Sequence, residues 1–555
     1  MRKAEWLLVA LVALASAGLV LVPVVILFLT ALNVGSAEDV IPRLVGLKNF
    51  AAIAGYPKVV FNTFEVAGLA TVVSLVFGGT IAWAVTRTNM RGGAMVEQLM
   101  SLPYYVTPLV GALAWAELGS ANGLINRSWH AFGRSGSLVD AYSPPMIALV
   151  MALFEGSVAF VMIAAAMKTM DATLEEASEA CGGGRLQTLW RITIPLLAPA
   201  IAGTAIFVFA EMLGSFAVPL VLGLPARFFV LTTLIYNEVS QFPPNYPLAA
   251  ALGIWLFLVM AGLLFLCRRL LGEGYGTIAA RSFRSKRLRL SKGMQTGLLT
   301  WCFGYVAVAV VLPLLTLLYV SLVPVVNAGS VTGVTLDNYV QALGLAPVRS
   351  ALVNSVVVGL GTAAIGVLFM GAVAWIIYRS QLPGARWLEY VVMFPQAIPR
   401  LVLGFAMLVA WVMFPVKLYG TLWLLLIAYL TVFLPLGVRT IAGVMTQIDR
   451  NLEECAEVCG ASILYRLRTI TLPLARPGLI AAAILLFIAS VREVNSSIFL
   501  MGPKSKVIGP TIVESWQIGT VGLTSAMALF QVLVMLAAVM ALLVIARRVR
   551  GGLGE

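Results

Sequence analysis

Charged residues are scarce in this chain. Of its 555 residues only 11% are Asp, Glu, Lys or Arg, whereas 61% are hydrophobic and the mean hydropathy is +0.98. Soluble domains carry roughly 25% charged and about 45–50% apolar residues, so this composition excludes a water-soluble globular fold. It is typical of a protein whose solvent is a lipid bilayer.

Residues that build catalytic and metal centres are also rare. The chain has one histidine and five cysteines. The cysteines fall in expected spans or on the reducing cytoplasmic side, so we expect no disulfide, and two of them at i and i+4 without further ligands make a poor zinc site. The Gly-x-x-x-x-Gly-Lys-Ser/Thr loop that cradles nucleotide phosphates does not occur in the sequence. The sequence therefore indicates no catalytic residue and no metal ligand, and it predicts that this chain binds no cofactor itself.

Long apolar runs make up most of the chain. A helix needs about 20 mainly apolar residues to cross ~30 Å of hydrocarbon. The sequence predicts an all-α, polytopic membrane protein with about twelve transmembrane helices. The expected spans are Trp6–Leu32, Val59–Thr86, Gln98–Leu118, Pro144–Met167, Pro199–Leu222, Pro247–Cys267, Gly297–Val323, Ala351–Tyr378, Leu388–Phe414, Thr421–Val438, Gly478–Leu500 and Leu523–Ala546.

The net charge of +13 is explained by topology. With the N-terminus inside, most Lys and Arg residues fall in segments on the cytoplasmic side, as the positive-inside rule describes. Contact with anionic lipid headgroups is a secondary effect. We therefore expect membrane lipids as partners and no nucleic acid, and we expect both chain ends in the cytoplasm of a bacterium with the protein in its inner membrane.

The chain contains an internal duplication. Landmarks of the first half recur 292 residues later, for example Arg87 as Arg379, and beyond an outside loop they recur 278 residues later, for example Pro195 as Pro473. Six spans in each half give the two halves the same orientation, which makes two parallel six-helix repeats with a pathway at their interface. We assign residues 1–272 to the first repeat, 273–296 to a basic cytoplasmic linker and 297–555 to the second repeat.

The longest cytoplasmic loop of each half, about 168–198 and about 445–476, follows one pattern. A glycine follows a glutamate by six positions, and a proline follows the glycine by thirteen. Thr173 with Glu176, and Asn451 with Glu454, predict capping boxes that start a short helix. The glycine ends that helix in the left-handed conformation, and the proline introduces the next span. The residues of the pattern are Glu175, Glu176, Ala177, Gly182 and Pro195 in the first loop, and Glu453, Glu454, Ala456, Gly460 and Pro473 in the second.

These loops resemble those of the permease subunits of type I binding-protein-dependent ABC importers, whose hallmark is Glu-Ala-Ala, then Gly, then Ile-x-Leu-Pro. Ser178 replaces the last alanine and Cys455 the middle one, and Ile194-Pro195 stands for Leu-Pro. The resemblance implies that the loops are coupling helices that insert into two separate ATPase subunits, which bind ATP and Mg²⁺. It also implies a periplasmic or lipid-anchored binding protein that delivers the solute.

The cargo is indicated by a narrower resemblance. The fused two-half form, the stretch from Gly223 to Tyr236, and the pair Arg492-Glu493 are similar to those of ferric-iron (Fe³⁺) transport permeases. This likeness implies ferric iron as the cargo. Related permeases carry thiamine, polyamines, phosphonates, sugar phosphates or sulfate, so these cargoes stay open.

Buried charges suggest a route for the cargo. A charge near the bilayer centre costs about 2.5–3.5 kcal/mol and usually faces a cavity or a partner. Carboxylates suit a hard cation, and an anion path would carry more arginine than the two found within spans. A simpler alternative is that Glu493 pairs with its neighbour Arg492. We hypothesise that the following residues line the path: Glu155, Glu211, Arg400, Arg492 and Glu493.

Two other functional classes remain open. An ion-coupled secondary transporter also uses repeats and buried carboxylates, but it does not need a pair of matched cytoplasmic loops. A membrane scaffold or enzyme is disfavoured, because the sequence shows no constellation of catalytic residues.

Overall fold

The computed structural model describes residues 2–35, 44–170, 173–271, 290–324, 333–380, 384–413 and 416–551, so most of the expected linker lies outside the described residues. Within these ranges the chain is mainly helical, with one isolated β-bridge between Asn33 and Val45. The helices of the first half are α1 (Arg2–Ala31), α2 (Lys48–Ala52), η1 (Ile53–Gly55), α3 (Pro57–Arg87), α4 (Gly93–Leu99), α5 (Leu102–Tyr105), α6 (Pro108–Gly119), α7 (Leu124–Ala131), α8 (Pro144–Thr169), α9 (Thr173–Ala180), α10 (Arg185–Thr188), η2 (Leu189–Thr193), α11 (Ile194–Leu213), η3 (Pro219–Gly223), η4 (Leu224–Ala226), α12 (Leu231–Ser240) and α13 (Tyr246–Leu271).

The second half repeats most of this order. Its helices are α14 (Lys292–Val306), η6 (Ala307–Val311), α15 (Leu312–Leu322), α16 (Asp337–Gly344), α17 (Ala346–Tyr378), α18 (Ala385–Met393), η7 (Phe394–Ala397), α19 (Arg400–Met413), α20 (Leu422–Val432), α21 (Leu434–Met445), α22 (Arg450–Val458), α23 (Ile463–Arg466), η8 (Leu467–Thr471), α24 (Leu472–Arg492), α25 (Ser497–Leu500), α26 (Ile508–Ile518) and α27 (Val521–Gly551).

The apolar helices confirm a polytopic all-α membrane protein. In the described part of the chain, nine helices are long and apolar enough to cross a membrane, and four bent pairs bring the total to 13 if each pair is one span. Twelve of these correspond to the spans expected from the sequence. The additional one is the bent pair formed by η3–η4 and α12, which lies between the fifth and sixth spans of the first half.

The third span is sharply broken in both halves. The first-half helices α4–α5 and α6 meet at 87°, and their second-half counterparts α18–η7 and α19 meet at 106°. Pro108 and Pro399 stand at these breaks, and the residue before each is extended, as the ring of a following proline requires. Irregular backbone at membrane depth is tolerated only where it is buried in protein or lines a cavity.

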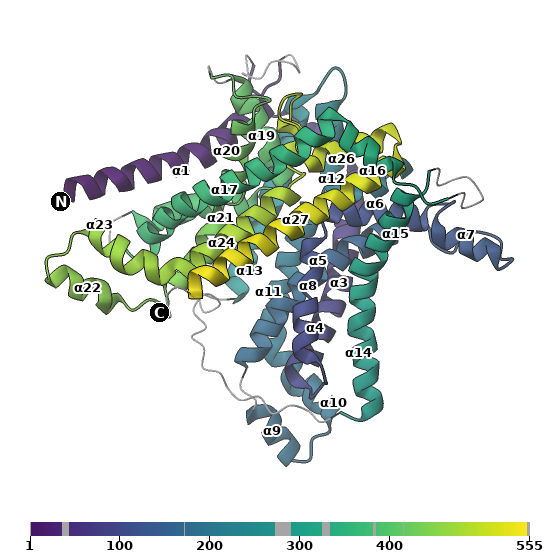
Figure 1. Ribbon diagram of the computed structural model, residues 1–555, viewed down its shortest axis with the longest axis horizontal. Helices are drawn as coiled ribbons and strands as arrows, with labels where there is room; N and C mark the ends of the chain where they lie inside the picture. The colour runs from purple at the N-terminus through teal and green to yellow at the C-terminus, as the bar shows by residue number, and fades with distance from the viewer. Residues whose placement is uncertain are drawn as a thin grey trace.

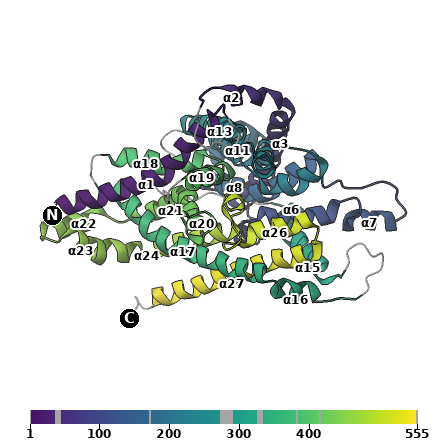
Figure 2. The same cartoon turned by 90° about the horizontal axis from the view of Figure 1, so that it is seen from above.

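The first span of each half packs on the other half. Val12 and Val20 of α1 belong to a core cluster whose other buried members all come from the second half. Conversely, α14 lies on the first half, where Trp301 donates a hydrogen bond to Thr80 Oγ1 (3.0 Å) and Tyr305 donates one to the Leu153 carbonyl (2.7 Å). Figure 2 shows α1 running beside α18 and α19. The first span of each half therefore packs against the other half and holds the two together.

The halves diverge toward the two short helices α9 and α22. In Figure 1 the long helices α3 and α8 of the first half run almost vertically, whereas α17, α24 and α27 of the second half run obliquely. The ends that carry α9 and α22 are therefore far apart, and the opposite ends converge near α12 and α26 (Figure 1). Both described chain ends lie on the side of α22.

Candidate functional site

The two loops with the shared pattern fold alike, and we call them the first elbow (residues 173–193) and the second elbow (residues 450–471). Their short helices, α9 and α22, have 8 and 9 residues. Gly182 and Gly460 both adopt φ +82°, the left-handed conformation that the sequence predicted. Just beyond them, Gly183 N–H donates to Ser178 O (2.8 Å) and Ala461 N–H to Ala456 O (2.9 Å), which closes both helices in the same way.

The start of the second elbow differs from the prediction. The N-cap of α22 is Asp449, whose side chain accepts a hydrogen bond from the Asn451 N–H at 3.0 Å. The predicted cap at Asn451 is therefore wrong, because the helix begins earlier and places Asn451 in its first turn. In the first elbow α9 is described from Thr173 onward. The matching Asp171 and the side chain of Glu176 lie outside what the structure describes.

The first glutamate of each pattern is turned into its own half. Glu175 accepts a hydrogen bond from Thr193 (2.7 Å) and lies 3.4 Å from the guanidinium of Arg87, whose side chain is only 2% exposed. The second elbow repeats this arrangement. Glu453 accepts a hydrogen bond from Thr471 (2.6 Å) and lies 3.8 Å from Arg379, also 2% exposed. The two arginines lie at the C-terminal ends of α3 and α17.

The opposite faces of the elbows are open to solvent. In the second elbow Glu454 and Cys455 are exposed and Val458 is 88% exposed. In the first, Ala177 and Leu174 are exposed. An exposed short helix that combines apolar side chains with a carboxylate is suited to docking in a groove of another protein.

Each elbow leads into the fifth span through a π-helical turn. Ile194 N–H donates to the carbonyl of Leu189, five residues earlier, and Leu472 N–H does the same to Leu467. Pro195 and Pro473 follow directly, so the wider turn accommodates a residue that has no N–H to donate. The prolines were expected to introduce the span, but the helix is already continuous before them, from residue 189 and from residue 467.

A central cavity of about 500 Å³ lies between the halves. Its lining includes α8, the broken third spans, the break between α20 and α21, and the points where α11 and α24 end. All five residues that the sequence assigned to a path line this one cavity: Glu155, Glu211, Arg400, Arg492 and Glu493. Glu65 and Glu117, the other two acidic residues within the first-half spans expected from the sequence, do not line it.

The cavity charges balance one another. Glu493, only 2% exposed, lies 3.8 Å from Arg400, whose side chain is 50% exposed because it projects into the open cavity. Glu493 also accepts hydrogen bonds from the backbone N–H (2.9 Å) and hydroxyl (3.1 Å) of Ser496. Arg492 instead lies 4.4 Å above the ring of Tyr104. The alternative pairing of Glu493 with its neighbour Arg492 is therefore wrong.

One charged lining residue was missed. Arg439 of α21 also lines the cavity, although the expected tenth span ended at Val438 and left this arginine outside. The only sequence signal was its place one residue beyond an apolar run. With Arg400 and Arg492, it gives the lining three arginines against three glutamates, so the expected shortage of arginine does not hold.

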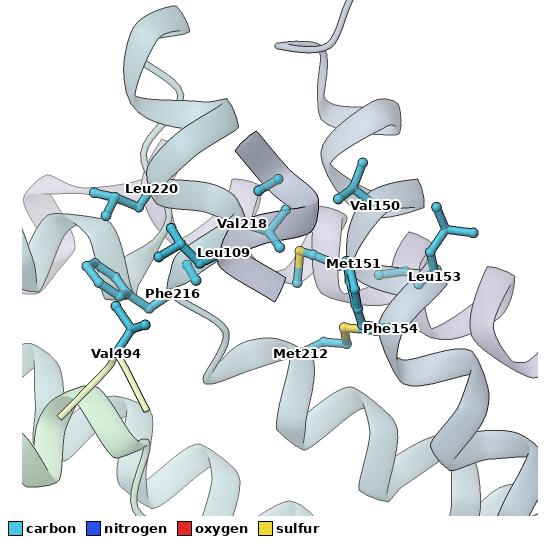
Figure 3. Close-up of a cluster of buried hydrophobic side chains, with 14 of the residues drawn as sticks. Leu109, Val150, Met151, Leu153, Phe154, Met212, Phe216, Val218, Leu220 and Val494 are labelled. Carbon is cyan, nitrogen blue, oxygen red and sulfur yellow. The ribbon is translucent and has the colours of Figure 1, made fainter. Parts of the chain in front are cut away.

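Part of the remaining wall of the cavity is packed hydrophobic core. Phe154, Met212 and Phe216 line the cavity and pack with Leu109 and Val218 in the cluster that Figure 3 shows. Val494, from the loop after α24, belongs to the same cluster (Figure 3). Since protein cores are close-packed, the charged groups project from a rigid surface.

Comparison with known proteins gives a consistent result. Residues 74–272 and 368–552 each match the family described as binding-protein-dependent transport system inner membrane component. The ferric transport system permease protein FbpB of Actinobacillus pleuropneumoniae is 26% identical over 488 residues, 87% of this chain and 70% of that protein. The putative ferric transport system permease protein FbpB 1 of Haemophilus influenzae is 27% identical, over 81% and 71%. The probable sulfate transport system permease protein cysT of Chlorokybus atmophyticus is 27% identical, over 39% and 76%.

Proposed function

This chain belongs to the binding-protein-dependent transport system inner membrane components, and from that premise we propose that it is the ABC importer permease through which ferric iron crosses a bacterial inner membrane. Both chain ends lie in the cytoplasm. A binding protein, periplasmic or lipid-anchored, delivers the cargo to the outer side. Two separate ATPase subunits, holding ATP and Mg²⁺, bind the elbows.

The pair of matched elbows carries this proposal. The exposed helix occurs twice. Each copy ends at a glycine with φ +82°, and a glutamate in each copy contacts an arginine and a threonine of its own half. The two helices therefore offer equivalent docking sites to two equivalent partners. A secondary transporter driven by an ion gradient has no use for such a pair. ATP-driven approach of the two partners would bring the elbows together and turn the diverging halves relative to one another.

The cargo is proposed from the relatives and from the cavity. Two ferric transport permeases align with most of this chain. Glu155, Glu211 and Glu493 each offer the hard carboxylate oxygens that a trivalent cation prefers, although no three acidic side chains of the described residues form a metal-binding group. Such ligands in an open cavity hold a cation while it passes, since conduction requires binding weak enough to release it.

A second cargo class is favoured by one observation. The guanidinium groups of Arg400, Arg439 and Arg492 all border the cavity, and arginine is the residue best suited to bind oxyanions. An oxyanion such as sulfate, or a phosphonate or sugar phosphate, is therefore the alternative to ferric iron. Thiamine and polyamines are cationic and would depend on the same carboxylates as iron.

The test is reconstitution. The chain is placed in proteoliposomes with its ATPase partner, and uptake of radiolabelled ferric iron from a purified binding protein is measured with and without ATP. Sulfate, thiamine and spermidine are offered in parallel. We expect uptake of iron alone, dependent on ATP and on the binding protein. Uptake of sulfate instead would select the second class, and uptake driven by a proton gradient without any ATPase would contradict the importer function.

A further inference from the structure

The second span of each half, α3 and α17, is joined at its cytoplasmic end to the elbow of the same half by an ion pair. Arg87 at the end of α3 contacts Glu175, and Arg379 directly after α17 contacts Glu453. Arg87 also donates a hydrogen bond to the carbonyl of Met167 in the last turn of α8 (3.1 Å). We call these Arg–Glu contacts the inner anchors.

The same two helices are bonded at their outer ends to the segment that follows the fifth span. In the first half the N–H of Leu231, the first residue of α12, donates to Thr63 Oγ1 at 2.9 Å, and Asn62 donates to the carbonyl of Phe229 at 3.1 Å. A first-turn N–H has no partner within its own helix. Thr63 of α3 therefore holds the start of α12 in place.

The second half repeats these outer bonds. The N–H of Ile508, the first residue of α26, donates to Ser355 Oγ at 2.8 Å, and Asn354 donates to the carbonyl of Lys506 at 2.9 Å. Both side chains belong to α17, and Ser355 is buried. We call these contacts of α3 and α17 with α12 and α26 the outer anchors.

The two outer helices meet across the halves. Gln517 of α26 donates a hydrogen bond to the hydroxyl of Tyr236 on α12 at 3.3 Å, and the Tyr236 ring lies 5.9 Å from that of Phe499. At the same time the elbows are far apart, because the halves diverge toward them (Figure 1). Contact at the outer ends and separation at the inner ends thus occur together.

We propose that α3 and α17 are struts that carry the movement of the elbows to α12 and α26, and that Glu175 and Glu453 are positioning residues of these struts rather than contacts for an ATPase. This inference rests on the proposed function. At 31 and 33 residues the struts are unbroken, and at 1.5 Å per residue each is roughly 45–50 Å long. The third spans are bent by 87° and 106° and cannot serve as levers.

The strut proposal predicts a linked motion. When the elbows approach one another, the inner ends of α3 and α17 follow through their inner anchors. The outer anchors then draw α12 and α26 apart and break the contact between Gln517 and Tyr236. The outer side opens at the moment when the inner side closes.

The first test cuts the outer anchors. Thr63→Val with Ser355→Ala removes both hydroxyls but keeps the shape of the side chains. Spin labels at Ser240→Cys and Ile518→Cys, both exposed, report the distance between α12 and α26 in a chain whose exposed Cys181, Cys455 and Cys459 are replaced by serine. With the ATPase bound, trapping a nucleotide lengthens this distance in the parent. In the variant we expect the lengthening to be lost and uptake to fall at least about tenfold, while ATP hydrolysis stays within about twofold.

A conservative exchange controls for packing damage. Thr63→Ser with Ser355→Thr keeps a hydroxyl at both outer anchors, so uptake and the distance change should be retained. If this exchange is as damaging as the removal of both hydroxyls, or if the removal leaves both readouts intact, the strut proposal is overturned.

The second test concerns the inner anchors. Glu175→Gln with Glu453→Gln should lower uptake about tenfold while leaving ATPase binding unchanged. The matched control is Glu97→Gln, which removes an exposed ion pair with Lys168 on the same side of the membrane and should have no effect. Loss of ATPase binding in the Glu175/Glu453 variant would show that these residues contact the ATPase and would overturn their role as anchors.

The parent separates this inference from the proposed function. If the parent imports cargo with ATP while the distance between α12 and α26 stays fixed, the strut proposal alone is overturned. A parent that binds no ATPase overturns the proposed function, and the struts with it.

Discussion

The elbows and the cavity follow opposite rules of symmetry. Both residues of each inner anchor have a counterpart in the other half, Arg87 with Arg379 and Glu175 with Glu453. The threonines that donate to these glutamates, Thr193 and Thr471, match as well. The six charged residues of the cavity have none. At the repeat offsets, Glu155, Glu211, Arg400, Arg439, Arg492 and Glu493 correspond to Phe433, Ala489, Pro108, Val161, Gly214 and Ser215.

The proposed function accounts for this difference. Two equivalent ATPases would require two equivalent docking helices, whereas a single cargo near the pseudo-two-fold axis would meet both halves at once. In a symmetric dimer each charged residue near the axis would occur twice. A second buried charge that lacks an oppositely charged partner raises the free energy of the folded protein in the membrane. Fusing the halves in one chain allows Arg400 to sit against Glu493 with neither residue duplicated.

Breaking the symmetry of the elbows should have the largest effect. A β-branched residue at φ +82° is a genuine backbone outlier, and the left-handed conformation costs about 1–2 kcal/mol even for ordinary residues. Gly182→Val and Gly460→Val should each lower ATP-dependent uptake at least about tenfold, by equal factors, and together abolish it. Membrane insertion should be normal.

Gly184→Val is the control for this pair. It lies in the same elbow, does not have a positive φ, and has open space around its Cβ position. Its uptake should be close to that of the parent. If one elbow tolerates valine at its helix-ending glycine and the other does not, the two docking sites are not equivalent and the comparison fails.

Removing the acidic charges of the cavity should have the next largest effect. Glu155→Gln with Glu211→Gln keeps the shape of the lining but leaves three arginines opposed by Glu493 alone. Uptake of ferric iron should fall about tenfold, whereas ATPase binding and basal hydrolysis should be unchanged, because the elbows are untouched. The measurement is initial uptake in proteoliposomes.

Two other glutamates provide the matched control. Glu65→Gln with Glu117→Gln removes two acidic residues of first-half spans that do not line the cavity, and should leave uptake intact. Uptake unaffected by the Glu155/Glu211 change would contradict the assignment of the cavity as the path.

Local and periodic features were predictable from the sequence. The apolar runs determine the spans, the offsets of 292 and 278 reveal the repeat, and the two glycines predict the ends of α9 and α22. The five path candidates converge on one cavity because buried charges in a membrane protein must find a polar environment.

Features that depend on tertiary contact were not predictable. Hydropathy measures how apolar a segment is and not the direction of its helix axis, so it did not reveal the bends of 87° and 106° in the third spans. The apolar surface of α1 fits either half equally well, and only packing places Val12 among second-half residues. Arg400 and Glu493 are far apart in sequence, whereas Arg492 is adjacent to Glu493, so proximity along the chain suggested the wrong pair.

The smallest effect is expected where the two elbows differ. In the first elbow the hydroxyl of Ser178 lies 2.8 Å from that of Thr188, whereas the second elbow has Ala456 and Arg466 at these places and pairs Arg466 with Glu457. A hydrogen bond of this kind contributes about 0.5–1.5 kcal/mol, and an exposed ion pair about 0–1 kcal/mol. Ser178→Ala and Glu457→Gln should therefore each lower thermal stability in detergent only slightly and leave uptake within about twofold. The inner anchors carry the coupling, whereas the Ser178–Thr188 hydrogen bond and the Arg466–Glu457 ion pair only stiffen their own elbow. A large loss of uptake from one substitution but not from the other would therefore mean that the two elbows differ in function.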